Sequence, residues 1–285
     1  MMSAKQAAAT HQERHLPSII FLSVLSLLYL FPMLNVLMNS FKGRFFISDI
    51  PFALPDSKTF VALENYVTGI VKSGFASAFG YSFFITIFSV LLLIFFTSMT
   101  AWYITRIKNR LNTMIYYLFV FSMIVPFQMV MFSMAKIANM LRLDTPVGIL
   151  VIYLGFGAGL SVFLFSGFVK SIPLEIEESA NIDGCNPLQT FFLVVMPVLR
   201  PTAITVAILN TMWVWNDFLL PYLVIGTNYK TIPIAVQGVL TGSYGGKDMG
   251  ALMAMLVLSI LPIIIFYLSC QKYIIKGVVA GAVKG

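Results

Sequence analysis

The densest group of acidic side chains in this sequence lies in one stretch, residues 170–200, between two apolar runs that are each long enough to cross a bilayer. This stretch holds four of the 11 acidic residues, Glu175, Glu177, Glu178 and Asp183. Carboxylates exchange protons, hold metal ions or pair with the basic groups of a partner. The other reactive side chains of the chain indicate which of these roles the carboxylates can have.

The remaining reactive side chains argue against catalysis and against a metal site. The 2 histidines, His11 and His15, lie in the polar N-terminal segment, and no HExxH or GxSxG motif occurs. A Ser–His nucleophile pair among the apolar segments is therefore excluded. Cys185 and Cys270 form neither a CxxC pair nor a Cys/His cluster, so a zinc site and a disulfide framework are not expected. We predict no catalytic residue and no metal ligand in this chain.

The sequence also lacks a loop that would bind the phosphates of ATP. No GxxxxGK[ST] string occurs, and the nearest string, GSYGGKD at 242–248, lacks the required spacing. It also has Asp248 where the hydroxyl that contacts Mg²⁺ belongs. We therefore expect no cofactor to be bound by this chain.

Within the stretch 170–200, the first half is typical of a short helix that ends in a tight turn. Ser171 and Pro173 favour a helix start. The acids that follow lie near the positive end of the helix dipole. The pair Asp183–Gly184 indicates a turn that ends this helix.

The second half of the stretch is typical of another helix. Asn186 precedes a proline and has Gln189 three residues later, which is the register of a capping box. Pro197 and Pro201 are expected to end this helix and to open the next apolar run. The loop thus reads helix, turn, helix. Periodicity alone leaves open whether it presents a rigid surface to a partner or is a solvated connection.

The composition places this loop in a polytopic membrane protein. Hydrophobic residues make up 59% of the chain and charged residues only 10%, against roughly 25% in soluble domains. The predicted fold class is all-α, a single transmembrane helix bundle that fills residues 1–285. Its six predicted spans cover residues of about 17–39, 77–104, 113–140, 146–169, 201–225 and 249–271.

The basic residues set the expected orientation of these spans. The net charge of +7 is spread over loops and termini, which is how membrane proteins fix their topology, and we do not expect nucleic acid as a partner. The segment RIKNR at 106–110 packs three bases into five residues between the second and third spans. We therefore place both termini, this segment and the loop 170–200 in the cytoplasm.

The loop also resembles the signature of ABC importer permeases, which reads EAA, three residues, Gly, nine residues and I-x-L-P. The matching positions here are Glu178-Ser179-Ala180, Gly184, Val194, Met196 and Pro197. Ser179 stands in place of an alanine and Val194 and Met196 in place of Ile and Leu, which are small-for-small and apolar-for-apolar exchanges.

Three further segments narrow this resemblance to sugar importers of the maltose type, and within them to the MalG-like subunit. They are WNDFLLPYL at 215–223, GSYGGKDMGALMA at 242–254 and YIIKGVVAGAVKG at 273–285. The resemblance covers nearly the whole chain. It implies a multi-pass permease of a bacterial or archaeal cytoplasmic (inner) membrane, which moves a sugar or oligosaccharide by alternating access.

The resemblance also implies partners and roles for particular residues. The partners are a second, MalF-like permease subunit, a dimeric cytoplasmic ATPase that holds ATP and Mg²⁺, an extracytoplasmic solute-binding protein, and membrane lipid. The coupling contact with the ATPase falls to Glu178, Ser179, Ala180, Asp183, Gly184 and Pro197. The tail residues Lys276, Gly277 and Lys284 are expected to reach the ATPase, or to anchor the tail at lipid headgroups.

The translocation path is less clearly marked. Asp217 is the carboxylate that falls inside a predicted span, and Asn210, Trp215 and Asn216 precede it. An intramembrane charge is a candidate for function, although a structural polar contact is an equal alternative for Asp217. An ion-coupled secondary transporter or a channel would work without an ATPase. Such a transporter usually buries several ionisable groups and shows an inverted repeat, and neither is evident here.

Overall fold

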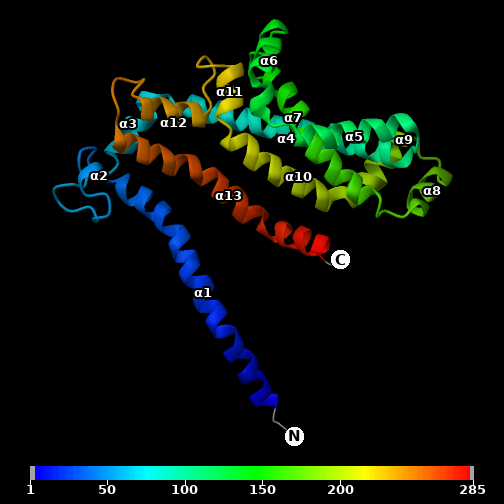
Figure 1. The fold of residues 1–285 in the computed structure, drawn as a ribbon, viewed down its shortest axis with the longest axis horizontal. Coiled ribbons are helices and arrows are strands. Elements are labelled where there is room, and N and C mark those ends of the chain that lie inside the picture. The colour runs from blue at the N-terminus through cyan, green and yellow to red at the C-terminus, as the bar shows by residue number, and fades with distance from the viewer. Residues whose placement is uncertain (1–3, 283–285) are drawn as a thin grey trace. The chain divides into compact units, whose positions relative to one another are not determined.

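The structure is a computed structural model that describes residues 4–282, with side chains described for residues 17–271. The described part of the chain is almost entirely helical, and its only β pairing is an isolated bridge between Lys42 and Phe60 (Figure 1). The predicted all-α class is confirmed. In chain order the helices are α1 (Ala4–Asn39), α2 (Phe46–Asp49), α3 (Glu64–Ser73), α4 (Phe75–Arg106), α5 (Arg110–Ile124), α6 (Phe127–Met140), α7 (Gly148–Val169), α8 (Leu174–Ile182), α9 (Pro187–Gln189), the π-helical segment η1 (Thr190–Val195), α10 (Met196–Asn216), α11 (Leu219–Val224), α12 (Ile232–Thr241) and α13 (Met249–Ala282).

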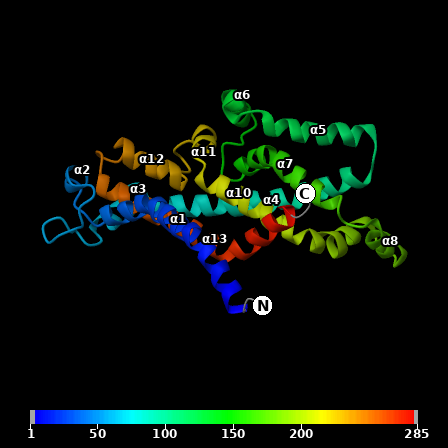
Figure 2. The ribbon, with the colours of Figure 1, turned by 60° about the horizontal axis from the view of Figure 1, so that its bottom comes forward.

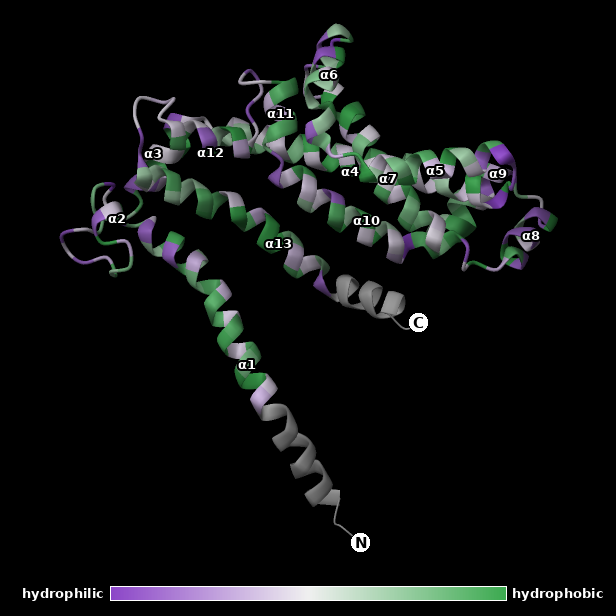
Figure 3. Ribbon diagram, viewed as in Figure 1, coloured by the Kyte–Doolittle hydropathy of each residue, from purple (hydrophilic) through white to green (hydrophobic). Residues whose placement is uncertain are grey.

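Several of these helices are long and apolar enough to cross a membrane. Within the described residues they are Pro17–Asn39, Phe75–Arg106, Gly148–Val169, Pro187–Asn216 and Met249–Gln271. These 5 candidates become 6 if the bent pair α5 and α6 is taken as one span. Figure 3 shows apolar residues along most of the length of these helices.

The span predicted for residues 113–140 is divided in the structure, because α5 and α6 meet at an angle of 106°. The break lies at Val125 and Pro126. Proline has no backbone N–H and disfavours helical geometry in the residue before it. Val125 accordingly adopts an extended conformation, with φ of −74° and ψ of 113°.

The chain divides into two compact units, residues up to 73 with 238–260, and residues 74–237 with those from 261 onward. In the first unit, the Asn65 amide donates hydrogen bonds to the carbonyls of Ser40 and Lys42. The buried Lys42 ammonium donates to the Ile50 carbonyl at 2.9 Å. These bonds hold the loop that follows α1.

In the second unit, α4, α7 and α10 lie side by side and pack against one another (Figures 1 and 2). One of its apolar clusters joins these helices to the segment 170–200. The long helices contribute the buried residues Ala101, Val162, Phe165, Val169, Leu199 and Val206 to this cluster. The segment contributes Ile172, Phe191 and Val195. The segment is therefore anchored in the helix bundle.

Gly159 allows α5 to approach α7 closely. A Cβ at this position would lie 2.7 Å from the Phe119 carbonyl oxygen of α5, a backbone atom that cannot rotate away. Small residues at such crossings let membrane helices pack backbone to backbone. At Gly155, one turn earlier on α7, an added Cβ meets nothing within 4 Å.

We expect Gly159→Ala to lower the free energy of unfolding by about 1–3 kcal/mol through overpacking. Gly155→Ala is the matched control and should not destabilise the protein. Thermal unfolding of the two variants in the same detergent checks this. Equal melting temperatures would contradict the packing described here.

Candidate functional site

The candidate site is the segment between α7 and α10, in which α8 is the first helix. α8 begins at Leu174, directly after Pro173, and ends at Ile182, as the sequence predicts. Figure 3 shows hydrophilic residues on α8, at one end of the long apolar helices of this unit. The acids Glu175 and Glu177 lie in the first turn, where the helix dipole favours negative charge.

The turn after α8 is fixed by backbone hydrogen bonds. The Cys185 N–H donates to the Ala180 carbonyl and the Gly184 N–H donates to the Asn181 carbonyl, which is the Schellman arrangement. Gly184 has a φ of +85°, in the left-handed region that only glycine adopts without cost. The predicted turn at Asp183–Gly184 is confirmed.

The start of the second helix is fixed by its side chains. The Gln189 N–H donates to Asn186 Oδ1 and the Asn186 N–H donates to Gln189 Oε1, each at 2.9 Å. The predicted capping box is therefore confirmed. Hydrogen bonds therefore fix the backbone of the segment at the turn after α8 and at the start of α9.

The prediction that Pro197 and Pro201 end this helix is wrong. α9, η1 and α10 follow one another without a break from Pro187 to Asn216, with Pro201 inside α10. A proline ring normally clashes with the carbonyl four residues earlier. For Pro197 this carbonyl belongs to Leu193, which lies within the π-helical segment η1. The wider turn of a π-helix leaves space there for the ring of Pro197. The second helix of the segment thus continues directly into a membrane span.

Most residues that the sequence marks for coupling are accessible. Glu178, Ser179, Asp183 and Gly184 are exposed on α8 and its turn, whereas Ala180 is buried. Pro197 is also exposed but belongs to the second helix, at the start of α10. The structure therefore brings Glu178, Ser179, Asp183 and Gly184 together on one surface, and leaves Ala180 buried and Pro197 apart.

The segment also carries exposed apolar residues that the sequence did not mark as candidates. Ile182 has 86% of its surface exposed at the end of α8, and Leu188 in α9 is 58% exposed. Two exposed apolar side chains on either side of a rigid turn are suited to a partner surface. The sequence feature that could have identified Ile182 is its position directly before the Asp183–Gly184 turn.

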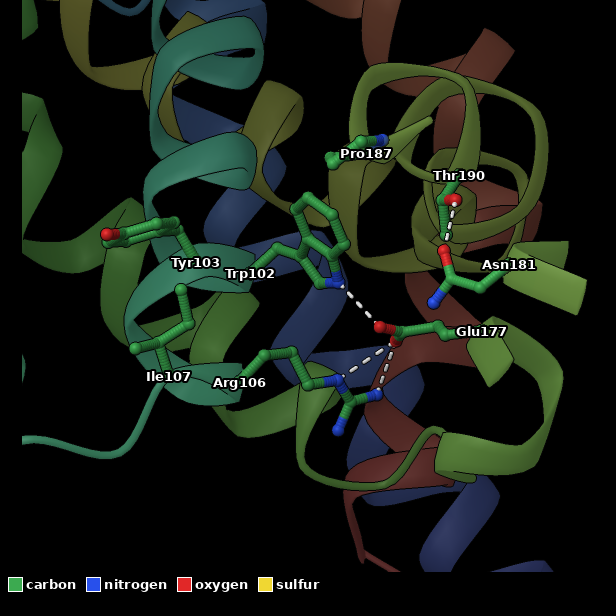
Figure 4. Close-up of a pocket in the computed structure, with 8 residues that line it drawn as sticks. All are labelled: Trp102, Tyr103, Arg106, Ile107, Glu177, Asn181, Pro187 and Thr190. Atoms are coloured by element: carbon green, nitrogen blue, oxygen red, sulfur yellow. Dashed lines mark hydrogen bonds and ion pairs between the residues drawn. The ribbon is translucent and has the colours of Figure 1, made fainter. Parts of the chain in front are cut away.

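The sequence also showed no sign of a partly buried polar cluster formed by Trp102, Arg106 and Glu177. Arg106 donates to Glu177 Oε1 from Nη2 at 2.6 Å and from Nε at 2.9 Å, and Trp102 Nε1 donates to Glu177 Oε2 at 3.0 Å (Figure 4). Arg106 Nη2 also donates to the Ile172 carbonyl at 3.0 Å. Glu177 is only 6% exposed. We call these three residues the Glu177 cluster.

The Glu177 cluster lines a small pocket between the end of α4 and the segment. The pocket has a volume of about 320 Å³, and Tyr103, Ile107, Asn181, Pro187 and Thr190 complete its lining (Figure 4). The Trp102 ring also packs on Phe191 of η1, with centroids 5.5 Å apart. The cytoplasmic end predicted for α4 therefore contacts both helices of the segment.

The residues predicted for a translocation path have structural partners. Asn210 is buried and donates to Ser161 Oγ of α7 at 3.2 Å. The Trp215 ring meets Phe79 edge to face, with centroids 5.9 Å apart. Asn216 is exposed and donates to the Met212 carbonyl.

Asp217 interrupts the helix that was predicted to run through residues 201–225. Its carboxylate accepts from the backbone N–H groups of Leu219 and Leu220, at 3.0 and 3.3 Å, and from the Tyr153 hydroxyl at 3.2 Å. The acid therefore begins α11 and ties it to α7. This contact favours the structural alternative for Asp217.

The tail residues Lys276, Gly277 and Lys284 lie outside the residues whose side chains the structure describes. Among the described residues, no group of three or more His, Cys, Asp or Glu side chains is placed to hold a metal ion.

Comparisons with known proteins bear on this site and on the whole chain. The profile of the family described as "binding-protein-dependent transport system inner membrane component" matches residues 93–279. The probable starch degradation products transport system permease protein AmyC of Thermoanaerobacterium thermosulfurigenes is 38% identical over 92% of this chain and 94% of its own length. The multiple sugar-binding transport system permease protein MsmG of Streptococcus mutans is 33% identical over 93% of this chain and 95% of its own length.

A solved structure shares the fold. A chain in the crystal structure of a bacterial ABC transporter involved in the import of the acidic polysaccharide alginate has a TM-score of 0.77. The match covers 93% of this chain and 97% of the other, at 21% identity.

We expect Asp217→Ala to lower the free energy of unfolding by about 1 kcal/mol, because it removes the acceptor at the start of α11. Asp217→Asn keeps an acceptor oxygen and should retain most of the stability. Thermal unfolding in detergent separates the two variants. A loss as large for the asparagine as for the alanine would show that the negative charge, rather than the hydrogen bonds, matters at this position.

Proposed function

Because this chain belongs to the family of binding-protein-dependent transport system inner membrane components, we propose that it is the sugar-conducting permease subunit of an ABC importer. Relatives named for starch degradation products and for multiple sugars support a sugar or oligosaccharide as the solute. The family description places the chain in the membrane part of the transporter. ATP and Mg²⁺ then belong to partner ATPase subunits.

The observation that carries this proposal is the shape of the segment 170–200. Glu178 and Ile182 are exposed on a short helix that a Schellman turn and a capping box hold in one conformation. Glu178 offers a charge to a basic group of the ATPase, and Ile182 offers an apolar side chain to a cleft on its surface. A disordered connection would have to lose conformational entropy on docking, whereas this one is ordered already.

The segment also suits the transmission of motion into the membrane. The second helix continues from Pro187 into α10 as far as Asn216, so a displacement at α9 passes directly to a span. Closure of an ATPase dimer on ATP would favour one of two packings of the helices, and hydrolysis would release it. Solute would enter from an extracytoplasmic binding protein, and a second, MalF-like permease subunit would complete the path. The tail around Lys276, Gly277 and Lys284 is proposed as a further contact with the ATPase.

An ion-coupled carrier is the alternative function. A carrier of that kind needs a titratable carboxylate in the path, and Asp217 is the residue that the sequence offers for this role. Its oxygens already accept three hydrogen bonds from Leu219, Leu220 and Tyr153. This engagement argues against proton or sodium coupling at Asp217.

Co-purification tests the proposed assembly. When this chain is tagged and expressed with the products of its neighbouring genes, an ATPase and a second permease should be retained with it in mild detergent. In a Cys270→Ser background, the half-exposed Cys185 beside the turn serves as a thiol reporter. Its labelling by a water-soluble maleimide should be slower in the assembled complex than in the isolated chain. A chain that purifies alone, with Cys185 labelled equally fast in both preparations, would contradict the assembly.

Gly184 provides a second test, because an added Cβ meets no atom within 4 Å and only the backbone conformation opposes a substitution. Gly184→Ala should cost about 1–2 kcal/mol locally and displace the turn. We expect normal amounts of protein in the membrane but uptake that is uncoupled from ATP hydrolysis. Gly184→Asn is the matched control, because asparagine tolerates the left-handed region. Normal uptake in the alanine variant would count against the coupling role.

A further inference from the structure

α8 is connected to its neighbours differently from the second helix of the segment. α9 runs through η1 into α10 without a break, but α8 is separated from α7 by residues 170–173 and from α9 by residues 183–186. Neither connection is helical. A force applied to the exposed face of α8 therefore does not reach a membrane span through continuous helix, and side-chain contacts have to carry it.

The Glu177 cluster provides such a contact. Glu177 and Glu178 are neighbours on α8, yet Glu178 is exposed and Glu177 is turned toward α4 (Figure 4). Both carboxylate oxygens of Glu177 are engaged, Oε1 by Arg106 and Oε2 by Trp102. The adjacent acids thus face in different directions, one available to a partner and one fixed to a span.

Arg106 fixes the beginning of α8 at two points. Its Nη2 donates to the Ile172 carbonyl just before the helix and to Glu177 inside the helix. The side chains of the pair are 16% and 8% exposed, so water screens their attraction only weakly. Charge-assisted hydrogen bonds of this kind are stronger and more directional than neutral ones. The hydrogen bonds of Arg106 therefore link the first turn of α8 to the last turn of α4.

We infer that Glu177 and Arg106 are positioning residues that transmit the movement of α8 to α4, with Trp102 as a supporting donor. This inference rests on the proposed function, because it assumes an ATPase that moves α8. α4 packs on both α7 and α10, so its displacement reaches the core of the bundle. The segment then acts on the bundle through two routes, the continuous helix into α10 and the ion pair to α4.

A double-mutant cycle in the complete reconstituted complex tests this inference. Sugar transported per ATP hydrolysed is measured in proteoliposomes for Glu177→Gln, Arg106→Gln and the double variant. The probes are radiolabelled maltotriose, raffinose and arabinotriose, and the sugar that the wild type transports is used for the variants. Glu175→Gln is the matched control, because it removes the same charge from an exposed position on the same helix.

The complexes are expected to assemble and hydrolyse ATP, while each single variant lowers the transport ratio by about fivefold or more. The double variant should fall no further than either single variant, because the two residues act through one contact. Glu175→Gln should keep the wild-type ratio. Wild-type ratios in assembled single variants, or losses that multiply in the double variant, would overturn the inference.

Trp102→Phe keeps the inference testable if a charge variant fails to assemble. It removes the donor to Oε2, keeps an aromatic ring beside Phe191, although a smaller one, and leaves the ion pair in place. The transport ratio should fall by about twofold or more for the loss of one charge-assisted hydrogen bond, and a wild-type ratio would overturn the inference. If the wild-type complex transports none of the sugars, or does not assemble with an ATPase, the proposed function fails and the inference fails with it.

Discussion

The ion pair between Arg106 and Glu177 is the interaction on which the arrangement of the segment 170–200 depends. It joins a short helix to the end of a membrane span, and Trp102 completes the set of donors around the carboxylate. Removal of one partner of a buried pair leaves an uncompensated charge, which is far more costly than the pair is stabilising. We propose that the pair helps to specify where α8 lies, more than it adds to the stability of the fold.

Backbone conformation restrains the rest of the segment. Gly184 provides the left-handed turn, and Asn186 with Gln189 fixes the start of the next helix. The π-helical turn before Pro197 then lets the chain pass a proline without ending the helix. Together these features give a partner a preformed surface whose two helices are connected to different membrane spans.

Local features of this fold were predictable from sequence, and long-range ones were not. The turn at Asp183–Gly184 and the capping box depend on residues within a few positions of each other, so their sequence signals are direct. The Arg106–Glu177 pair joins residues 71 positions apart. From the sequence pattern, Arg106 was interpreted as one of the basic residues that set membrane topology. Glu177 was interpreted as an acid that stabilises the helix dipole. The break at Pro126 and the continuity through Pro197 show why proline position is ambiguous. A proline breaks a helix or is accommodated in it depending on whether the helix can widen locally. Tertiary packing decides this.

We propose that the segment 170–200, held to α4 and continuous with α10, connects an ATPase to this bundle. Structures of the assembled complex without nucleotide and trapped with ATP and vanadate test it most directly. We expect α8 to contact the ATPase through Glu178 and Ile182, and we expect α8 and the end of α4 to move together with the Arg106–Glu177 pair intact. An α8 that touches no ATPase in either state, or a pair that separates while α4 stays in place, would contradict it.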